Sequence, residues 1–523
     1  MRLDPMARRA RALAVGLSIV FAVSCLAVLG YVKYVRVTEH LGSLRGHLHS
    51  MEAMAEGDLL SAAQEEDLSS LRQELVGTRE DLAAIKAELG PTLTIARFFG
   101  WVPVIGGDLA AGQDLLDMGI GFATAGDALF EGLGPVLPLV AGQEDPPSGS
   151  GTMETVALAT AEGQPHFQLA RAEIERAQAL REGLSAETLS PKVSGLVDRL
   201  DRYLPLLNTG VHALLVAPSL LGADEPRAYL LLAQNEQELR ATGGFISSVA
   251  LLRLSEGRIV ELDFRDSYAV DDLSQPHPSA PQPLEEYMLA QIWLLRDATW
   301  YADFPSSAEV ARELYHLDRG VLVDGVIAAD LTAMQLLVGA MEPLELEGYE
   351  EEVTAANVVG LMQRYWASPT GEGQTGDWWI HRKDFMGDLL SAMMETLQSD
   401  ISSIDLGRMG SALQRCLTEK HILIYMADPE LSASVSKSGW DGGIRSTEGD
   451  YLMVVDSNMG FNKVNAAVRA SVDYRVTLES QKASLGRLSV VYDNPSRVEV
   501  QQCVQEAAYP PTYQEMMEGC YWD

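Results

Sequence analysis

An uncharged apolar stretch near the N-terminus constrains this chain more than any other feature. It runs from Ala12 to Val32, and its 21 residues span roughly 30 Å as a helix, enough to cross a bilayer. The basic residues before it are Arg2, Arg8, Arg9 and Arg11, and those after it are Lys33 and Arg36. This excess favours a cytoplasmic tail at 1–11, one transmembrane helix at 12–32 and an exported remainder.

A cleaved signal peptide is the alternative interpretation of this stretch. The stretch is long for the apolar part of a signal peptide, and the small-residue cleavage sites after it are poor. No later segment reads as apolar enough to cross again. The sequence therefore predicts a single-pass membrane protein with most of its mass outside the cytoplasm.

Charge and cysteine content narrow the classes of partner. The formal net charge is −35 at pH 7, and a field of that sign repels phosphate backbones, which argues against nucleic acid as a partner. Solubility alone also accounts for such a charge.

Four cysteines are too few for a disulfide-built scaffold, although Cys503 and Cys520 are close enough in sequence to pair. The chain has no CxxC motif or Cys/His cluster, which argues against a zinc site.

Helical periodicity fills the membrane-proximal region at 38–220. Apolar residues recur every three or four positions over 41–89, with charged residues between them. One interpretation is a stalk or a coiled-coil surface for a partner. A helical hairpin that packs on itself is favoured, because the heptad phase breaks between Met51 and Leu68. Further helices are predicted up to about Val140, at 163–184 and at 190–215.

Strand and helix patterns begin to alternate near Tyr229. The runs SVALLRL and RIVELDF predict two strands of a hairpin, joined by a turn at Ser255–Gly257. The segment SSAEVARELYHL is helical in pattern, and a later strand leads into a helix capped by Asp330. This alternation predicts a layered α/β domain with a mixed sheet at 226–402.

The last part of the chain, 412–523, has strand candidates separated by polar turns. They are HILIYMAD, YLMVVDSN, AAVRASVDYRVTLE and GRLSVVYDN. They predict a small β-rich portion. The chain stops at EMMEGCYWD as though a strand were to continue, which is typical of a truncated C-terminus.

Polar residues follow the first predicted strand of the α/β domain. They are Asn235, Glu236, Glu238 and Arg240, with Gly243 and Gly244 behind them. Ligands of open α/β sheets bind at the carboxyl ends of strands, and glycines there let backbone N–H groups approach an anion. Alternatively, the two glycines serve only the backbone of the turn.

A second group of charged residues follows the hairpin. Arg265 and Asp266 end its second strand, and Asp271 comes shortly after. An arginine beside acidic groups can hold a phosphate while a carboxylate binds Mg²⁺, although a salt bridge that pins the loop is the alternative. Further candidates by residue type are Arg296, Asp297, Asp303, the general-base candidate His381, Arg382 and Lys383. No GxSxG, Walker or HExxH motif is present.

Several segments resemble a bacterial membrane family, domain of unknown function four thousand and twelve (DUF4012). They are YLLLAQNEQELRATGGFISSVALLRLSEGRI, DATWYADFPSSAE, GVIAADLTAMQLLVGAMEPLEL, VTAANVV, RKDFM and GWDGGIRSTEGDYLMVVDSNMGFNKVNAAV. The resemblance covers the anchor, the helical region and everything after it.

The layout from Tyr229 to about Ser402 is also similar to the LytR-CpsA-Psr phosphotransferase domain. The matching pieces are FRDS at Phe264–Ser267, VDGVIAADLTAMQLLVGAMEPLEL and HRKDFMGDLLSAM. Those enzymes move a glycopolymer phosphate from a polyprenyl-pyrophosphate carrier onto a cell-wall hydroxyl, with arginines on the pyrophosphate and Asp-bound Mg²⁺. The resemblance implies a protein that handles polyprenyl-pyrophosphate-linked glycopolymers in the envelope, up to and including phosphotransfer.

This second resemblance assigns roles residue by residue. It implies that Arg265 and Asp266 are catalytic. The implied substrate-binding residues are Arg240, Arg265, Arg382 and Asn235, and the implied Mg²⁺ ligands are Asp266, Asp271 and Asp303.

The chain also departs from the LytR-CpsA-Psr pattern. Asn235 stands where the family has an early aspartate, and the uncharged Phe245–Ser247 stands where it has Arg-Ser-Asp. Lys463–Val468 mimics a family motif in a different order along the chain, so it is given no role. These departures favour the alternative of a non-catalytic envelope scaffold that retains the fold and docks partners through 41–89.

Overall fold

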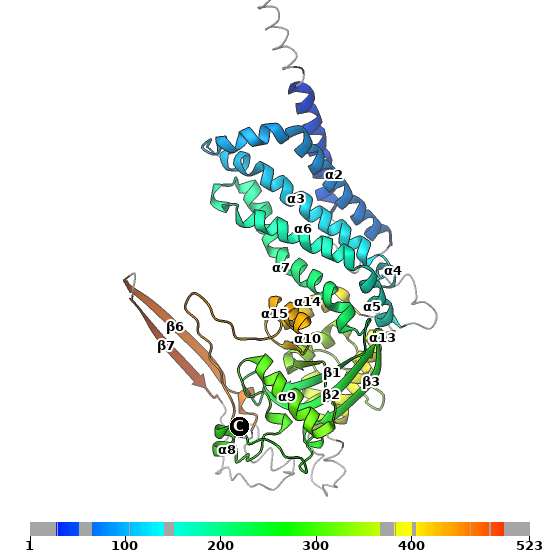
Figure 1. The fold of residues 1–523 in the computed structure, drawn as a ribbon, viewed down its shortest axis with the longest axis vertical. Coiled ribbons are helices and arrows are strands. Elements are labelled where there is room, and N and C mark those ends of the chain that lie inside the picture. The colour runs from blue at the N-terminus through cyan, green and yellow to red at the C-terminus, as the bar shows by residue number, and fades with distance from the viewer. Residues whose placement is uncertain are drawn as a thin grey trace, which may run out of the picture. The chain divides into compact units, whose positions relative to one another are not determined.

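The structure is a computed structural model (Figure 1). It describes residues 28–51, 65–140, 151–366, 381–399, 404–480 and 483–495, except 29, 104, 382 and 461. The predicted cytoplasmic tail, most of the predicted transmembrane segment, Cys503 and Cys520 lie outside these residues. Contacts divide the chain into a helical unit (1–144 and 162–215) and an α/β unit (145–161 and 216–523).

The helical unit is built from long helices. They are a helix at 30–51, α2 (Glu65–Ala96), α3 (Gly106–Leu133), α4 (Leu137–Val140), α6 (Gln164–Glu182) and most of α7 (Pro191–Leu220). Ion pairs join the first helix to α2: Arg36 lies 2.9 Å from Glu88, and His40 lies 2.8 Å from Asp81. Because the residue numbers rise in one helix as they fall in the other, the two helices run antiparallel. This arrangement agrees with the predicted hairpin.

One described helix has the length and composition of a membrane span. This helix is α7. Core helices of soluble proteins can have the same length and apolar composition. Its Val197 and Val211 are buried against other helices of the helical unit. The described residues therefore offer only weak evidence for a membrane span.

The α/β unit contains a mixed five-stranded sheet in the order β3-β2-β1-β4-β5. The strands are β1 (Arg227–Asn235), β2 (Phe245–Ser255), β3 (Arg258–Asp266), β4 (Gly325–Ala329) and β5 (Ile422–Met426). Neighbouring strands are antiparallel except for β1 and β4, which are parallel. The coarse prediction of an α/β domain with a mixed sheet is confirmed.

The predicted hairpin between β2 and β3 is confirmed as well. Glu256 and Gly257 form its two-residue turn, and both have positive φ, 52° and 76°. Positive φ at both positions matches the twist of the flanking strands. A Cβ at Gly257 would lie 2.5 Å from the carbonyl oxygen of Met153, so only glycine fits beside α5 (Thr152–Glu162).

Helices cover the two faces of this sheet (Figure 1). On one face α9 (Phe304–Arg319) packs into a continuous apolar core with Leu230, Leu251 and Val326. A second core belongs to α10 (Leu331–Met341), α11 (Val358–Trp366), α13 (Asp384–Ser399) and the start of α14 (Leu406–Thr418). Asp330 caps α10 by accepting a hydrogen bond from Ala333 N at 2.8 Å, as predicted.

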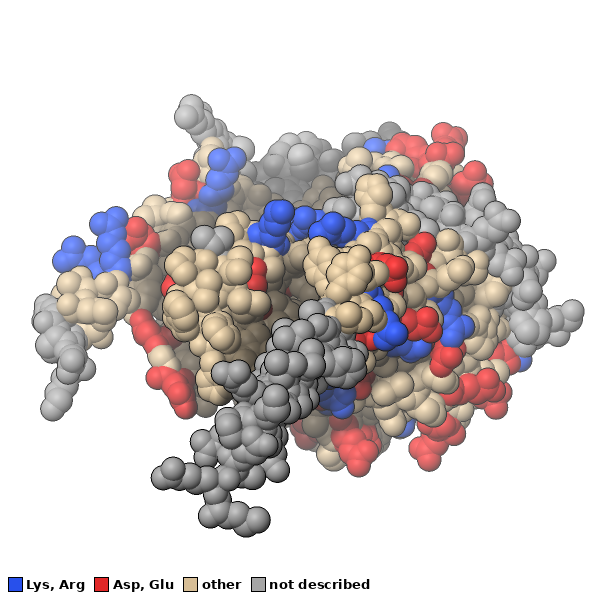
Figure 2. Space-filling model, turned by 90° about the horizontal axis from the view of Figure 1, so that it is seen from above, with Lys and Arg blue, Asp and Glu red and all other residues tan. Residues whose placement is uncertain are grey.

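The C-terminal part differs from the prediction in two respects. The strand predicted within 421–428 is β5, which belongs to the five-stranded sheet and not to a separate β-rich portion, so the α/β fold extends beyond the predicted bound at 402. The strand predicted at 451–458 is wrong, because this segment has no regular structure and half of the Tyr451 side chain is exposed. After β5 and α15 (Pro429–Lys437), β6 (Arg469–Ser480) and β7 (Ala483–Asp493) form a small two-stranded antiparallel sheet. Acidic side chains are spread over the face seen in Figure 2, with lysines and arginines between them.

Candidate functional site

A cavity of about 300 Å³ lies between the sheet and α10, α11 and α13. Most of its lining is apolar. The sheet contributes small side chains, Ala233, Ser248, Ala250 and Ala329, and the helices contribute flexible ones, Met334, Met362, Met386, Met393 and Met394. Short side chains under long unbranched ones leave space that the packing does not fill.

Strand alternation explains why one face of the sheet is hollow and the other is solid. Side chains of successive strand residues point to opposite faces. Leu231 and Ala233 line the cavity, whereas Leu230 is fully buried in the core with α9. The same strand therefore contributes to a packed core and to a binding cavity.

Two cations and an aromatic ring belong to the polar part of the lining. Trp366 ends α11, Lys383 precedes α13 and Lys463 comes from the segment before β6. The Lys463 ammonium lies 4.1 Å from the centre of the Trp366 ring, and the Lys383 ammonium lies 6.0 Å from it. An ammonium at such distances is attracted to the ring face. Two cations thus lie beside a mostly apolar cavity, whose lining also contains the acidic Asp330.

Asn235 and two glutamines complete this polar region. Asn235 lines the cavity at the carboxyl end of β1 and accepts a hydrogen bond from Gln237 N at 3.0 Å. Gln363 of α11 donates to the Gln237 side chain at 3.2 Å. Of the described residues predicted to bind substrate, Asn235 is the one that lines this cavity.

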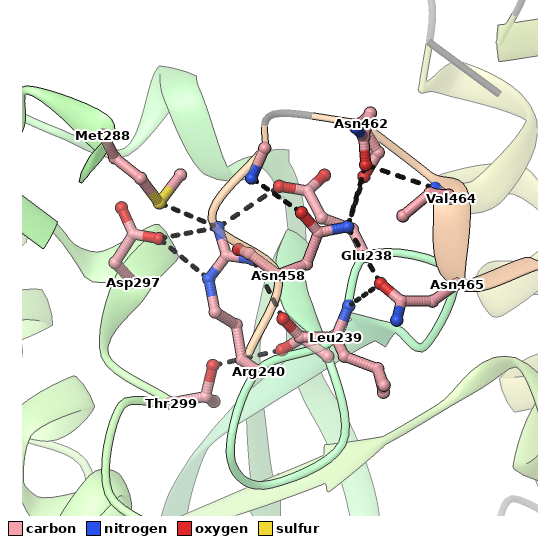
Figure 3. Close-up of polar contacts among 12 residues, drawn as sticks. Glu238, Leu239, Arg240, Met288, Asp297, Thr299, Asn458, Asn462, Val464 and Asn465 are labelled. Carbon is pink, nitrogen blue, oxygen red and sulfur yellow. Dashed lines mark hydrogen bonds and ion pairs between the residues drawn. The ribbon is translucent and has the colours of Figure 1, made fainter. Parts of the chain in front are cut away.

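Arg240 lies in a buried polar network next to the cavity (Figure 3). None of its side chain is exposed, and its Nη2 lies 3.2 Å from a carboxylate oxygen of Glu238 and 3.2 Å from one of Asp297. Its Nη1 donates to the Asn458 carbonyl at 3.0 Å. Burial raises the pKa of Glu238, although the charge of Arg240 acts in the opposite direction. Arg240 therefore holds the loop after β1 against a distant segment.

That distant segment carries Lys463. Asn458 donates from Nδ2 to Asn465 Oδ1 at 2.8 Å, and the same oxygen accepts a hydrogen bond from Leu239 N at 3.2 Å. Figure 3 shows these asparagines facing the loop of Leu239 and Arg240. The network fixes the backbone on both sides of Lys463. Lys463 was given no role from the sequence, because the motif at Lys463–Val468 occurs at a different place along the chain than in the LytR-CpsA-Psr family.

The Arg265–Asp266 pair lies outside the cavity lining. Arg265 Nε lies 2.8 Å from Asp263 Oδ2, and Asp266 accepts a hydrogen bond from Tyr268 N at 3.0 Å. Phe264, the residue before them, does line the cavity. Arg382 lies outside the described residues. Exposed His381 pairs with Asp384 at 2.7 Å.

The predicted Mg²⁺ ligands Asp266, Asp271 and Asp303 do not form one cluster. Asp271 is buried 3.2 Å from Arg296, and its burial raises its pKa to about 6. Asp303 caps α9 and also accepts a hydrogen bond from Ile444 N at 2.9 Å. In the described part of the chain, the acidic and histidine side chains close enough to share one ion are Glu236, Asp330 and His421.

Comparison with known proteins identifies part of the α/β unit. No curated protein matches the chain. A family model described as a protein of unknown function (DUF4012) matches 224–365, which contains β1 to β4, α9, α10 and most of α11. Lys383 and Lys463 lie beyond the matched range. The part of the sheet formed by β1 to β4 is therefore similar to the DUF4012 family, whose function is not known.

Proposed function

We propose that this protein binds a polyprenyl-phosphate-type lipid and handles the attached glycopolymer at the outer face of a bacterial cell membrane. The observation that carries the proposal is the apolar cavity with Lys383 and Lys463 in its lining. The predicted anchor at 12–32 would tether the protein to the membrane that holds such lipids.

The lining suits one end of an isoprenoid chain. Ligand cavities begin at roughly 300 Å³ and are mostly apolar, with a few polar groups that orient the ligand. Methionine side chains rotate about three bonds and adapt to irregular apolar shapes. The cavity therefore fits part of a long flexible hydrocarbon better than a rigid polar metabolite.

The two ammonium groups suit an anionic head group. Lysine binds phosphate as a compact point charge, which suits a phosphate without demanding the two-point geometry of arginine. The chain as a whole carries a net charge of −35, so two lysines beside one cavity contrast with their surroundings. A phosphate or pyrophosphate on an apolar tail satisfies both parts of the lining.

The arginine contacts favour the alternative of a non-catalytic envelope scaffold over phosphotransfer. Among the described residues, Arg240, Arg265 and Arg296 each pair with a carboxylate and none lines the cavity. The arginine clamp implied by the LytR-CpsA-Psr resemblance is therefore unsupported for these three. In this alternative, the protein retains the fold and docks partners through the helical region at 41–89.

A binding assay with a fluorescent polyprenyl-pyrophosphate analogue tests the proposal. The full chain in detergent is titrated with and without Mg²⁺, and polyprenol without phosphate serves as the competitor that lacks charge. We expect Lys383→Ala and Lys463→Ala each to weaken binding about tenfold, the effect of losing roughly 1.4 kcal/mol. Exposed Lys192→Ala is the matched control.

Two further variants separate the cavity from the arginine clamp. Met386→Trp fills the cavity and should abolish binding, whereas Arg265→Ala should leave it unchanged. Loss of binding in Arg265→Ala alone would support the clamp instead. No saturable binding by a folded wild-type protein would refute the proposal and direct attention to protein partners.

A further inference from the structure

Two carboxylates and an imidazole converge at the carboxyl edge of the central strands. They belong to Glu236, Asp330 and His421, and their ligand atoms all lie within 4.8 Å of one another. We propose that these three residues form a binding site for one divalent transition-metal ion, with Zn²⁺ as the ion of best fit. The three metal-binding side chains do not require a particular ligand in the cavity.

The topology of the sheet creates this convergence. Glu236 follows β1 and Asp330 follows β4, and because these strands are parallel neighbours, their carboxyl ends meet at one edge. His421 precedes β5, which runs antiparallel to β4 and therefore starts at the same edge. Asp330 N donates to the His421 carbonyl at 3.2 Å, which fixes the two backbones together.

Neighbouring groups already orient each donor. Asp330 uses Oδ1 to cap α10, and its Oδ2 lies 2.7 Å from His421 Nδ1. Thr332 Oγ1 donates to Glu236 Oε1 at 3.0 Å. The other imidazole nitrogen, Nε2 of His421, lies 3.4 Å from a carboxylate oxygen of Glu419. A carboxylate behind a histidine is the usual outer contact of a metal-bound imidazole, because it fixes the tautomer that leaves the inner nitrogen to bind the ion.

The charge of the cluster also calls for a cation. No Lys or Arg forms an ion pair with Glu236 or Asp330 among the described residues, and Asp330 is only 10% exposed. Burial first, and then the charge of Asp330, raise the pKa of Glu236. A divalent ion bound between them would neutralise the two carboxylates.

The donor set selects the class of ion. Imidazole favours zinc and other transition metals, whereas Mg²⁺ and Ca²⁺ prefer oxygen alone. Zinc sites with three protein ligands often combine histidine with a carboxylate and leave one position open. Asp330 also lines the cavity, so the ion would lie at the cavity wall. A site built from oxygen and nitrogen donors has no cysteine pattern, so the lack of CxxC and Cys/His clusters in the sequence does not bear on it.

Zinc titration of the full chain in detergent tests the proposal. After removal of metals with a chelator, calorimetry with Zn²⁺ should show one site per chain, and binding should weaken as the pH is lowered because protons compete. Loss of an outer contact alone weakens metal binding 10–100-fold, so Glu236→Gln and His421→Gln should each weaken it by about 100-fold or more. Asp384→Asn is the matched control. It alters the exposed His381–Asp384 pair, which does not belong to the cluster of Glu236, Asp330 and His421.

Circular dichroism checks that each variant is folded, and Co²⁺ substitution gives a spectrum that reports a nitrogen and oxygen ligand set. The proposal is overturned if the wild type binds no Zn²⁺, or if Glu236→Gln and His421→Gln bind it as tightly as Asp384→Asn. Met386→Trp should retain zinc while losing the lipid analogue. The metal site and the lipid site can therefore fail separately.

Discussion

Arg240 is a buried arginine, unlike an ordinary arginine on the protein surface. Its side chain is fully buried between Glu238 and Asp297. Removing one member of a buried charge group leaves the others without a partner. The contribution of Arg240 is therefore expected in the stability of the α/β unit rather than in ligand contact.

We expect Arg240→Met to lower the free energy of unfolding of the α/β unit by about 3–5 kcal/mol, the usual cost of breaking a buried ion pair. Urea denaturation followed by circular dichroism measures this change. Arg265→Ala is the matched control, because the Arg265–Asp263 pair is about one-third exposed and should contribute less than about 1 kcal/mol. Equal effects of the two substitutions would contradict the assignment.

Asp271 gives a residue-level prediction about pH. Its pKa rises from 3.8 in the unfolded chain to about 6 in the folded protein, chiefly because the carboxyl is buried. The folded state therefore binds this proton more tightly. The resulting stabilisation is complete below about pH 4 and is lost as the pH rises through about 6, a difference of about 3 kcal/mol.

Asp271→Asn should remove this pH dependence. The free energy of unfolding of both proteins is measured with urea at several pH values. The value for the wild type minus the value for the variant should decrease between about pH 4 and about pH 7. Parallel pH profiles for the two proteins would show that Asp271 does not titrate in this range.

At the level of elements, β1 is under two different packing constraints. Leu230 is fully buried in the core with α9, whereas Leu231 borders the cavity. Leu230→Ala should lower the free energy of unfolding by about 2–5 kcal/mol, because it opens a new void in a close-packed core. Leu231→Ala enlarges an existing space and should lower it by less, while changing affinity for the lipid analogue. Denaturation and binding assays on both variants check this prediction. A larger loss of stability in Leu231→Ala than in Leu230→Ala, with a change of affinity only in Leu230→Ala, would refute it.

Local signals in the sequence predicted several of these elements correctly. The turn at Ser255–Gly257 and the cap at Asp330 depend on residues within a few positions of each other, and both are confirmed. The run at 451–458 was wrongly predicted as a strand. It has apolar residues but no neighbouring strand to pair with, and pairing is not visible in a local pattern.

The candidate site was much less predictable than the fold. Asn235 was found because a polar residue at a strand end is a local signal. Lys463 lies at the cavity because its segment contacts Leu239 and Arg240, more than 200 positions earlier in the chain. The cavity itself arises from volumes left between three helices and a sheet, which no single segment encodes.

At the scale of the whole molecule, the chain should unfold in more than one step. It divides into two units with their own buried cores, and domains of this kind generally do not unfold as one cooperative system. We expect differential scanning calorimetry of the full chain to resolve two transitions. One transition with matching calorimetric and van't Hoff enthalpies would contradict this expectation.

Two substitutions should assign these transitions. Glu154→Ala removes the ion pair with Arg258 at 2.6 Å within the α/β unit, and Asp201→Ala removes the pair with Arg181 at 2.7 Å within the helical unit. Each should lower the midpoint of its own transition by about 2–4 °C and leave the other unchanged. Shifts of both midpoints by either substitution would show that the units unfold together.

The asparagines around Lys463 have a consequence for genetics. Neither Asn458 nor Asn465 lines the cavity, yet both fix the segment that carries Lys463. A screen for loss of ligand binding should therefore recover alleles at these asparagines together with alleles at Lys463. The two groups would share a phenotype for different reasons. Substitution of Lys463 removes the positive charge, whereas substitution of Asn458 or Asn465 leaves the charge in place along the chain but no longer holds it at the cavity.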